Sequence, residues 1–238
     1  MIKEMTKKVF RYFGKRITNY HAPAKPYCEG LLFLSTLISK PDWVIDIGVA
    51  DGTPELINAF PFKHYNYLLV EADSRYSESL DVLEKQYMST VNVENCFCGA
   101  EDGTVDFYEN KNGRLSSKYA NRESSSVIKK EVKKLDSLCE KYHIKGNIFL
   151  KIDVEGAEMD VLRGATKTLA LCDVVLLESW INPLGSVSTP SDFATIVSFM
   201  KQNSFVVFDF FGGHSYKNGV LKMIDIVFVK ENSEYRKV

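Results

Sequence analysis

Three carboxylic acids lie where a short apolar run passes into helical spacing. The stretch LKIDVEGAEMDVLRGA (residues 150–165) contains Asp153, Glu155 and Glu158. Because ligands bind at the carboxyl ends of the strands in open α/β sheets, an acid directly after a strand can touch a cofactor or a reacting group. We expect this of Asp153. Glu155 and Glu158 fit better as acids of a first helical turn, where the helix dipole and backbone amides favour negative charge.

A glycine-containing loop follows an earlier apolar run. In VIDIGVADGTPEL (residues 44–56), Asp46, Gly48 and Gly52 give the pattern D-x-G-x-x-x-G, and Thr53 before a proline marks a helix start. Glycines allow tight turns and close approach of the backbone to a ligand. Glu71 ends the next apolar run, where a carboxylate is suited to accept hydrogen bonds from ribose hydroxyls. These five residues predict a site for a cofactor that contains a nucleoside.

Two cofactors compete for such a loop. A nicotinamide dinucleotide site normally has G-x-G-x-x-G, with the pyrophosphate at a helix N-terminus, whereas this loop has two glycines at a different spacing. An acid at the end of the first strand would also repel a pyrophosphate. S-adenosylmethionine has no phosphate and carries a cationic amino group and a sulfonium, so the sequence favours S-adenosylmethionine.

The elements that must position these residues alternate along the chain. Amphipathic, helix-like stretches such as SESLDVLEKQY (77–87) and SDFATIVSFMKQN (191–203) separate apolar, strand-like runs. This alternation predicts an α/β fold with a mostly parallel sheet covered by helices on both faces. The seven predicted strands are WVIDIG (43–48), YNYLLVEA (65–72), VNVENCF (91–97), NIFLKID (147–153), DVVLLES (173–179), FVVFDFF (205–211) and MIDIVFV (223–229).

Composition excludes several classes of protein. The 238 residues are 45% hydrophobic, enough for one large core, and the net charge of −1 gives no overall attraction to nucleic acids. The five cysteines form no CxxC or Cys/His pattern, so we expect neither disulfides nor a zinc site, and a reducing cytoplasm fits best. No apolar run approaches the roughly 20 residues that span a bilayer.

Two segments differ from the rest. Residues 1–17 carry six Lys or Arg against one Glu, with apolar residues near helical spacing, a pattern that fits either a helix packed on its own domain or peripheral contact with an anionic membrane. We expect residues 1–40 to be a helical extension or lid and residues 41–238 to be the catalytic domain. Residues 111–126 are rich in Ser, Asn and charge and predict a mobile connection.

These motifs resemble those of the FkbM family of methyltransferases. LKIDVEGAEMDVLRGA closely matches that family's most specific segment, KKLDSL precedes it, and VIDIGVADG is similar to its cofactor loop, although Asp51 stands where Asn is common. In LLVEAD a proline that often follows the acid is missing. The resemblance spans residues 43–230. It implies a Rossmann-like class I fold with seven strands, the last antiparallel, and adenine contacts near Gly99 and Ala100 in CGAEDGTVDFY.

The resemblance implies O-methylation of a sugar, a glycan or a glycosylated natural product. A hydroxyl acceptor must lose a proton, and His214 follows the sixth strand on the ligand side, whereas His64 and His143 precede strands and His21 lies in the extension. We therefore name Asp153 and His214 as candidate catalytic residues.

An alternative mechanism uses a divalent ion between Asp153 and Glu178, but no third ligand is evident, and we favour a metal-free route. Aromatic residues are expected in loops at the ligand end of the sheet, where they could stack on a sugar: Trp180, Phe211 and Tyr216, near His214. A binding module without activity is the other alternative. The presence of all the residues expected at the cofactor site argues against it: Asp46, Gly48, Gly52, Glu71 and Asp153.

Overall fold

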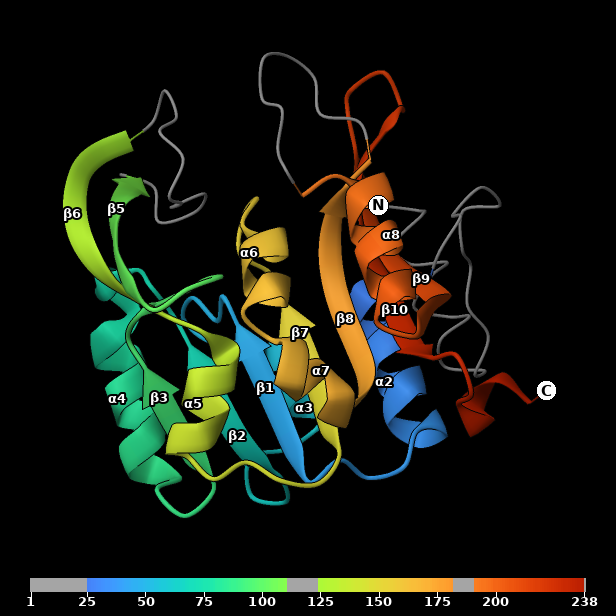
Figure 1. Ribbon diagram of the computed structural model, residues 1–238, viewed down its shortest axis with the longest axis horizontal. Coiled ribbons are helices and arrows are strands. Elements are labelled where there is room, and N and C mark those ends of the chain that lie inside the picture. The colour runs from blue at the N-terminus through green and yellow to red at the C-terminus, as the bar shows by residue number, and fades with distance from the viewer. Residues whose placement is uncertain (1–24, 111–123, 182–190, 238) are drawn as a thin grey trace, which may run out of the picture.

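A seven-stranded sheet forms the centre of the molecule (Figure 1). The structure is a computed structural model that describes residues 25–110, 124–181 and 191–237. The strand order is β3-β2-β1-β7-β8-β10-β9, and β10 is antiparallel to both of its neighbours while the other strands are parallel to one another. The seven predicted strands and the antiparallel last strand are therefore confirmed. The strands are β1 (Trp43–Ile47), β2 (Asn66–Val70), β3 (Val91–Glu94), β7 (Ile148–Ile152), β8 (Cys172–Trp180), β9 (Phe205–Ser215) and β10 (Leu221–Lys230).

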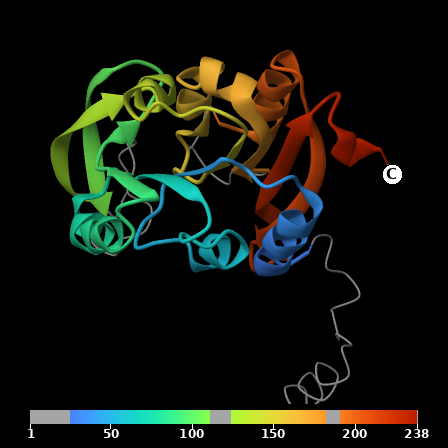
Figure 2. The same ribbon diagram turned by 90° about the horizontal axis from the view of Figure 1, so that it is seen from below.

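Helices cover both faces of this sheet, as Figure 2 shows from below. One face packs against α2 (Tyr27–Leu37), α3 (Pro54–Ala59) and α4 (Ser77–Gln86), and the other against α5 (Leu135–Lys141), α6 (Glu158–Arg163), α7 (Thr166–Leu171) and α8 (Phe193–Gln202). All five residues of the central strand β7 are buried. That burial follows from two-sided coverage of a parallel sheet and explains why the central strands read as continuous apolar runs. The described residues also form two short 3₁₀ helices, η1 (Ser74–Tyr76) and η2 (Glu234–Arg236).

A second, three-stranded sheet was not predicted. It contains β4 (Phe97–Cys98), β5 (Gly103–Asn110) and β6 (Ser124–Lys133), and the β5–β6 hairpin rises beside the carboxyl edge of the large sheet (Figure 1). Residues 124–126 belong to β6, so the expected loop over 111–126 is wrong at its end, and residues 111–123 lie outside the described residues. The missed signal is alternation in β5, where half-buried Val105 and buried Phe107 alternate with exposed Thr104 and Asp106.

The described part of the N-terminal extension is fixed to the end of the sheet. Lys25 forms an isolated bridge with Phe211, and its carbonyl accepts a hydrogen bond from the Gly212 amide (2.8 Å). In α2, Gly30 lies flat on the Phe211 ring, and Leu31 is fully buried. The basic segment and His21 lie outside the described residues, and the division at residue 40 stays a prediction. No helix in the described ranges is long and apolar enough to cross a membrane.

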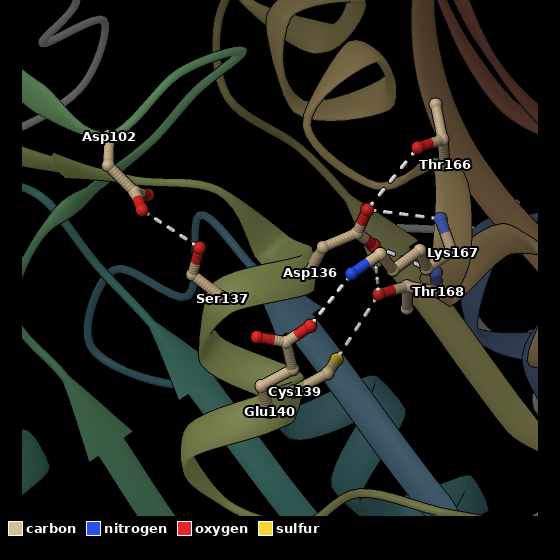
Figure 3. Close-up of polar contacts among 8 residues, drawn as sticks. All are labelled: Asp102, Asp136, Ser137, Cys139, Glu140, Thr166, Lys167 and Thr168. Carbon is tan, nitrogen blue, oxygen red and sulfur yellow. Dashed lines mark hydrogen bonds and ion pairs between the residues drawn. The ribbon is translucent and has the colours of Figure 1, made fainter.

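The KKLDSL stretch forms a joint between helices, shown in Figure 3. The Asp136 carboxylate in α5 accepts hydrogen bonds from backbone amides and hydroxyls of residues 166–168, at distances of 2.8–3.3 Å. The next residue, Ser137, donates to Asp102 in the loop before β5 (2.9 Å). These contacts satisfy the first amides of α7, which have no partner within the helix. The role of this motif is therefore to hold α5, α7 and the β4–β5 loop together.

Candidate active site

A cavity of about 350 Å³ opens at the carboxyl ends of β1, β2 and β7. Its polar wall includes Gly48, Glu71, Asp153 and Glu155, so the structure brings together residues that are up to 107 positions apart in the chain. Its apolar wall comes from the end of β2, from residues 96–98 and from Phe107 of the second sheet. The volume lies in the range of small-molecule sites, roughly 300–1,000 Å³. One end of the cavity is therefore acidic and the other apolar.

The loop after β1 turns through three residues with positive φ: Gly48 (+84°), Ala50 (+53°) and Gly52 (+112°). A Cβ at position 48 would lie 1.8 Å from the backbone oxygen of Asp153, so only glycine fits where the ends of β1 and β7 meet. Position 52 has open space around it and requires glycine only for its backbone angle. Gly48 thus shapes the cavity directly, and Gly52 shapes the turn behind it.

Glu71 connects this loop to the one after β2. Its buried carboxylate accepts hydrogen bonds from the backbone amides of Ala50 and Asp73, each at 2.7 Å. Burial raises the pKa of Glu71, and the amide donors oppose that rise. A carboxylate offers about four acceptor positions, so capacity remains for hydroxyl donors in the cavity.

Asp46 lies beneath the cavity and not in its wall. It is 1% exposed, and its two oxygens contact the ammonium of Lys151 (2.9 Å) and the hydroxyl of Thr53 (2.7 Å). Thr53 is the N-cap residue of α3, as predicted, but its hydroxyl bonds to Asp46 and not to the helix backbone. Lys151 balances the negative charge of Asp46, and contact of Asp46 with the cofactor stays a prediction.

Lys151 is the functional candidate that the sequence analysis missed. It is 4% exposed, pairs with Asp46 and lies 3.4 Å from Asp153. The signal was present: Asp46 and Lys151 each interrupt an apolar strand, and the parallel register sets them opposite each other. Because a buried charge needs a partner, each residue predicts an opposite charge close to it, and the strand order identifies that partner.

Three carboxyl groups form a row across three neighbouring strands. The register places Asp225 of β10 opposite Glu178 of β8, and Glu178 is one position beyond the Ile152–Leu177 pair, level with Asp153. Side chains of alternate residues share a face, and Val227 and Leu176 place this row on the face that α2 covers. We call Asp153, Glu178 and Asp225 the carboxyl row.

Burial, together with the crowding of acids, raises the pKa values at this edge of the sheet. Burial, and then the charge of Asp153, raise the pKa of Glu178 to about 9 and the pKa of Asp225 to about 7. Burial and Asp153 also raise the pKa of Glu155 to about 7. Carboxyl groups that lose their protons near neutral pH are common in catalytic sites, although structural clusters also show them.

The other two acids of the segment at residues 150–165 have different roles. Glu155 lies in the cavity wall with φ +51°, a left-handed conformation that is uncommon for a residue with a side chain. Glu158 is buried at the start of α6, and its carboxylate accepts a hydrogen bond from the Gly156 amide (2.8 Å). Glu158 therefore caps the turn, whereas Glu155 faces the ligand space.

Several predicted site residues lie outside the cavity wall. Gly99 donates its amide to the Lys133 carbonyl (2.9 Å) and packs between β6 and Gly164, while the neighbouring residues 96–98 face the cavity. Ala100 does not line the cavity either. Contacts of Gly99 and Ala100 with a cofactor stay predictions.

The residues expected in loops after the sixth strand lie mainly in β9. This strand extends to Ser215, so His214 is an exposed strand residue paired with Met223 and does not line the cavity. Phe211 is fully buried beneath α2 and is not available for stacking on a sugar, which corrects the expectation. Trp180 ends β8 and Tyr216 follows β9, both half-buried.

Comparison with known proteins gives the family. The family model described as "Methyltransferase FkbM domain" matches residues 46–207, more than half of the chain. The chain belongs to the FkbM methyltransferase family. No curated protein matches this methyltransferase. Among solved structures, it is similar to a precorrin-6y C5,15-methyltransferase from Geobacter metallireducens, with 10% identity, 91% of this chain and 94% of that one covered, and a TM-score of 0.48. It is also similar to fibrillarin from Aeropyrum pernix with natively bound S-adenosyl-L-methionine, with 13% identity, coverage of 83% and 73%, and a TM-score of 0.44.

S-adenosylmethionine is the cofactor of this methyltransferase, and the lining of the cavity fits it. The apolar wall formed by Phe97, Phe107 and Cys96 suits a purine, and the carboxylate of Glu71 suits the ribose hydroxyls. The acidic end suits the cationic amino group and sulfonium. Among the residues that the structure describes, no group of three His, Cys, Asp or Glu side chains is arranged to hold a metal ion.

Proposed function

We propose that this methyltransferase transfers a methyl group to a hydroxyl of a sugar, a glycan or a glycosylated natural product. The observation that carries the proposal is the position of Asp153: its side chain is 40% exposed in the cavity wall and lies directly after β7, beside Gly48. An acceptor oxygen that reaches this end of the cavity meets a carboxylate. The FkbM segment around Asp153 supports the same assignment.

When bound, S-adenosylmethionine supplies the methyl group, so that the acceptor's oxygen–hydrogen bond is replaced by an oxygen–carbon bond and one proton is released. The residues of the chain provide positioning and a place for that proton. Gly48 and Glu71 form the backbone cradle and the hydroxyl-binding wall, and Asp153 accepts the proton on its carboxylate. Positioning of this kind is worth several kcal/mol of the barrier.

An aromatic side chain near the carboxyl row supports a polar, ring-shaped acceptor. Trp180 stands at the carboxyl end of β8, two residues along the strand from Glu178 of the carboxyl row, with the Lys222 ammonium 4.6 Å from the centre of its ring. Aromatic faces at the mouth of a site commonly stack on sugar rings. The free thiols of all five cysteines agree with a cytoplasmic location, which we include in the proposal.

The test combines binding with turnover. Calorimetry should show micromolar-scale binding of S-adenosylhomocysteine and none of NAD. Glu71→Gln should weaken that binding about tenfold or more, because the amide keeps one acceptor oxygen and turns its N–H groups towards one of the two backbone donors, Ala50 or Asp73. The exposed Glu101→Gln is the matched control and should bind as the parent does. Equal binding by the Glu71→Gln variant would place the ribose elsewhere.

Assays of turnover identify the molecule that accepts the methyl group and the residue that accepts the proton. Methyl-labelled S-adenosylmethionine should label members of a panel of neutral glycans, amino sugars and nucleotide sugars, and EDTA should leave the rate nearly unchanged. Asp153→Asn should lower kcat by about 10²–10⁴-fold. A loss of that size in His214→Ala, with Asp153→Asn active, would move the base to the β9–β10 hairpin. Loss of activity with EDTA that Mg²⁺ restores would show a metal-dependent reaction.

A further inference from the structure

Lys151 occupies an unusual place for a lysine. Its side chain lies inside the central strand β7, 5% exposed, between the carboxylates of Asp46 (2.9 Å) and Asp153 (3.4 Å). The Asp46 carboxylate also accepts a hydrogen bond from the Thr53 hydroxyl. This bond fixes the position of one of the two carboxylates that contact the lysine. An ion pair as buried as Lys151–Asp46 seldom adds net stability, since desolvation offsets the attraction. A functional role therefore explains the lysine better than a stabilising one.

The ammonium lies at one end of the carboxyl row. Asp153 is in direct contact with it, whereas Glu178 and Asp225 follow one and two strands further along the sheet. The charged or titratable groups that face Asp153 come from every element around it: Asp46 on β1, Lys151 on β7, Glu155 in the following turn, Glu178 on β8, Asp225 on β10 and Tyr27 on α2. Among these groups, Lys151 carries the positive charge. Because it contacts Asp153 directly, it stabilises the ionised form of that carboxyl group in particular.

We propose that Lys151 is a positioning residue: anchored by Asp46, its ammonium holds Asp153 in place as an ionised carboxylate, so that Asp153, and not Glu178 or Asp225, receives the acceptor's proton. The proposal rests on the function proposed above. It agrees with the raised pKa of Glu178, whose charged neighbours are acids, and with that of Asp225, where burial and Asp153 outweigh the opposing charge of Lys151. Removing the lysine should let Asp153 share protons with the rest of the row.

The variant that tests this is Asp46→Asn combined with Lys151→Met, because Lys151→Met alone would leave Asp46 as a buried unpaired charge. Asp46→Asn with Lys151→Gln, which keeps a polar pair of similar shape, is the second variant if the first melts below the assay temperature. Lys230→Met is the matched control. Lys230 is also a strand lysine, half-buried at the opposite end of β10, where it donates to the Leu169 carbonyl (2.7 Å).

The first readout is binding and needs no acceptor. S-adenosylmethionine carries a positive charge at sulfur and S-adenosylhomocysteine does not, so the ratio of their Kd values reports negative charge beside the cavity. In the parent protein and in Lys230→Met, we expect this ratio to change between pH 8 and pH 6 only as far as Glu155 in the cavity wall, with a pKa of about 7, takes up a proton. In the double variant the preference for S-adenosylmethionine should fall about fivefold to tenfold further at pH 6, because the ammonium no longer favours the ionised form of Asp153. Asp153→Asn should show the low preference at both pH values.

The second readout is the pH profile of kcat in the presence of an acceptor. Its acid limb should move upward by about one pH unit or more in the double variant, with little change in KM. A ratio and an acid limb that both match those of the parent protein would overturn the proposal. If the pH-dependent ratio appears but no hydroxyl acceptor is methylated, the role of Lys151 in fixing the charge of Asp153 stands and the proposed reaction fails. If the parent protein binds neither S-adenosylmethionine nor S-adenosylhomocysteine, the proposed function itself is refuted.

Discussion

Replacement of Glu178 by glutamine should stabilise the folded protein, and should do so in a pH-dependent way. Glu178 lies in the middle of the carboxyl row, and burial together with the charges of Asp153, Glu155 and Asp225 raises its pKa from 4.5 to about 9. A carboxyl group whose folded-state pKa is raised favours the native state at low pH. That contribution is complete below pH 4.5 and is lost progressively as the pH rises towards 9.

The magnitude follows from the pH interval. Between pH 4.5 and pH 7 the unfolded chain ionises this carboxyl group while the folded protein resists it, at a cost of about 1.4 kcal/mol for each pH unit. The upper limit at pH 7 is therefore about 3 kcal/mol. Because the side chain is partly exposed and its charge is screened, we expect glutamine to add about 1–2 kcal/mol at pH 7 and little at pH 4.5.

Denaturation by urea at pH 4.5, 6 and 7.5 measures this difference. Glu178→Gln should gain stability relative to the parent protein as the pH rises, while the exposed control Glu101→Gln should track the parent at all three values. A difference that is independent of pH would mean that glutamine changes packing and not charge. A parent protein that gains more stability than Glu178→Gln with rising pH would refute the account of the carboxyl row.

Two further predictions concern parts of the chain away from the cavity. Gly30→Ala should destabilise the protein by about 1–3 kcal/mol, measured by thermal melting, because a Cβ there would lie 2.3 Å from the Phe211 ring and would push α2 off β9. Thiol labelling of the folded protein at pH 8 should modify Cys28 within minutes and the other four cysteines only on unfolding, since Cys28 is exposed whereas burial raises the pKa of Cys96 to about 12.

The large sheet could be predicted from the sequence because each of its strands is strongly patterned. Strands such as β7 are buried on both faces and read as apolar runs, and the helices between them carry one apolar side. The second sheet was missed because β4 has two residues and β6 begins within a polar stretch. Half-buried alternation is a weaker signal than a continuous apolar run when the neighbouring sequence looks like a loop.

The site could be predicted where function requires an unusual residue type, and not where it depends on spatial pairing. Gly48, Glu71 and Asp153 were found from their places after strands, and the structure sets all three in one cavity. Lys151 was missed because its partner Asp46 is 105 residues away, and only the strand order makes them neighbours. His214 was placed on the correct edge of the sheet, but the extra length of β9 could not be foreseen from a stretch with two glycines.

The carboxyl row gathers several acids at one edge of the sheet, and its cost in stability indicates why they are there. Acids that raise one another's pKa values destabilise the folded protein once they ionise. Their presence at one edge of the sheet is therefore explained by function and not by stability. If Glu178→Gln stabilises the protein and slows methyl transfer, the row serves the reaction at the expense of the fold. If it stabilises the protein and leaves the rate unchanged, the requirement narrows to Asp153, which Lys151 contacts. Because a pKa of about 9 leaves Glu178 mainly protonated at pH 7, the rates of the parent protein and of Glu178→Gln should be compared at pH 7 and above pH 9, where only the parent protein gains a charge at this position.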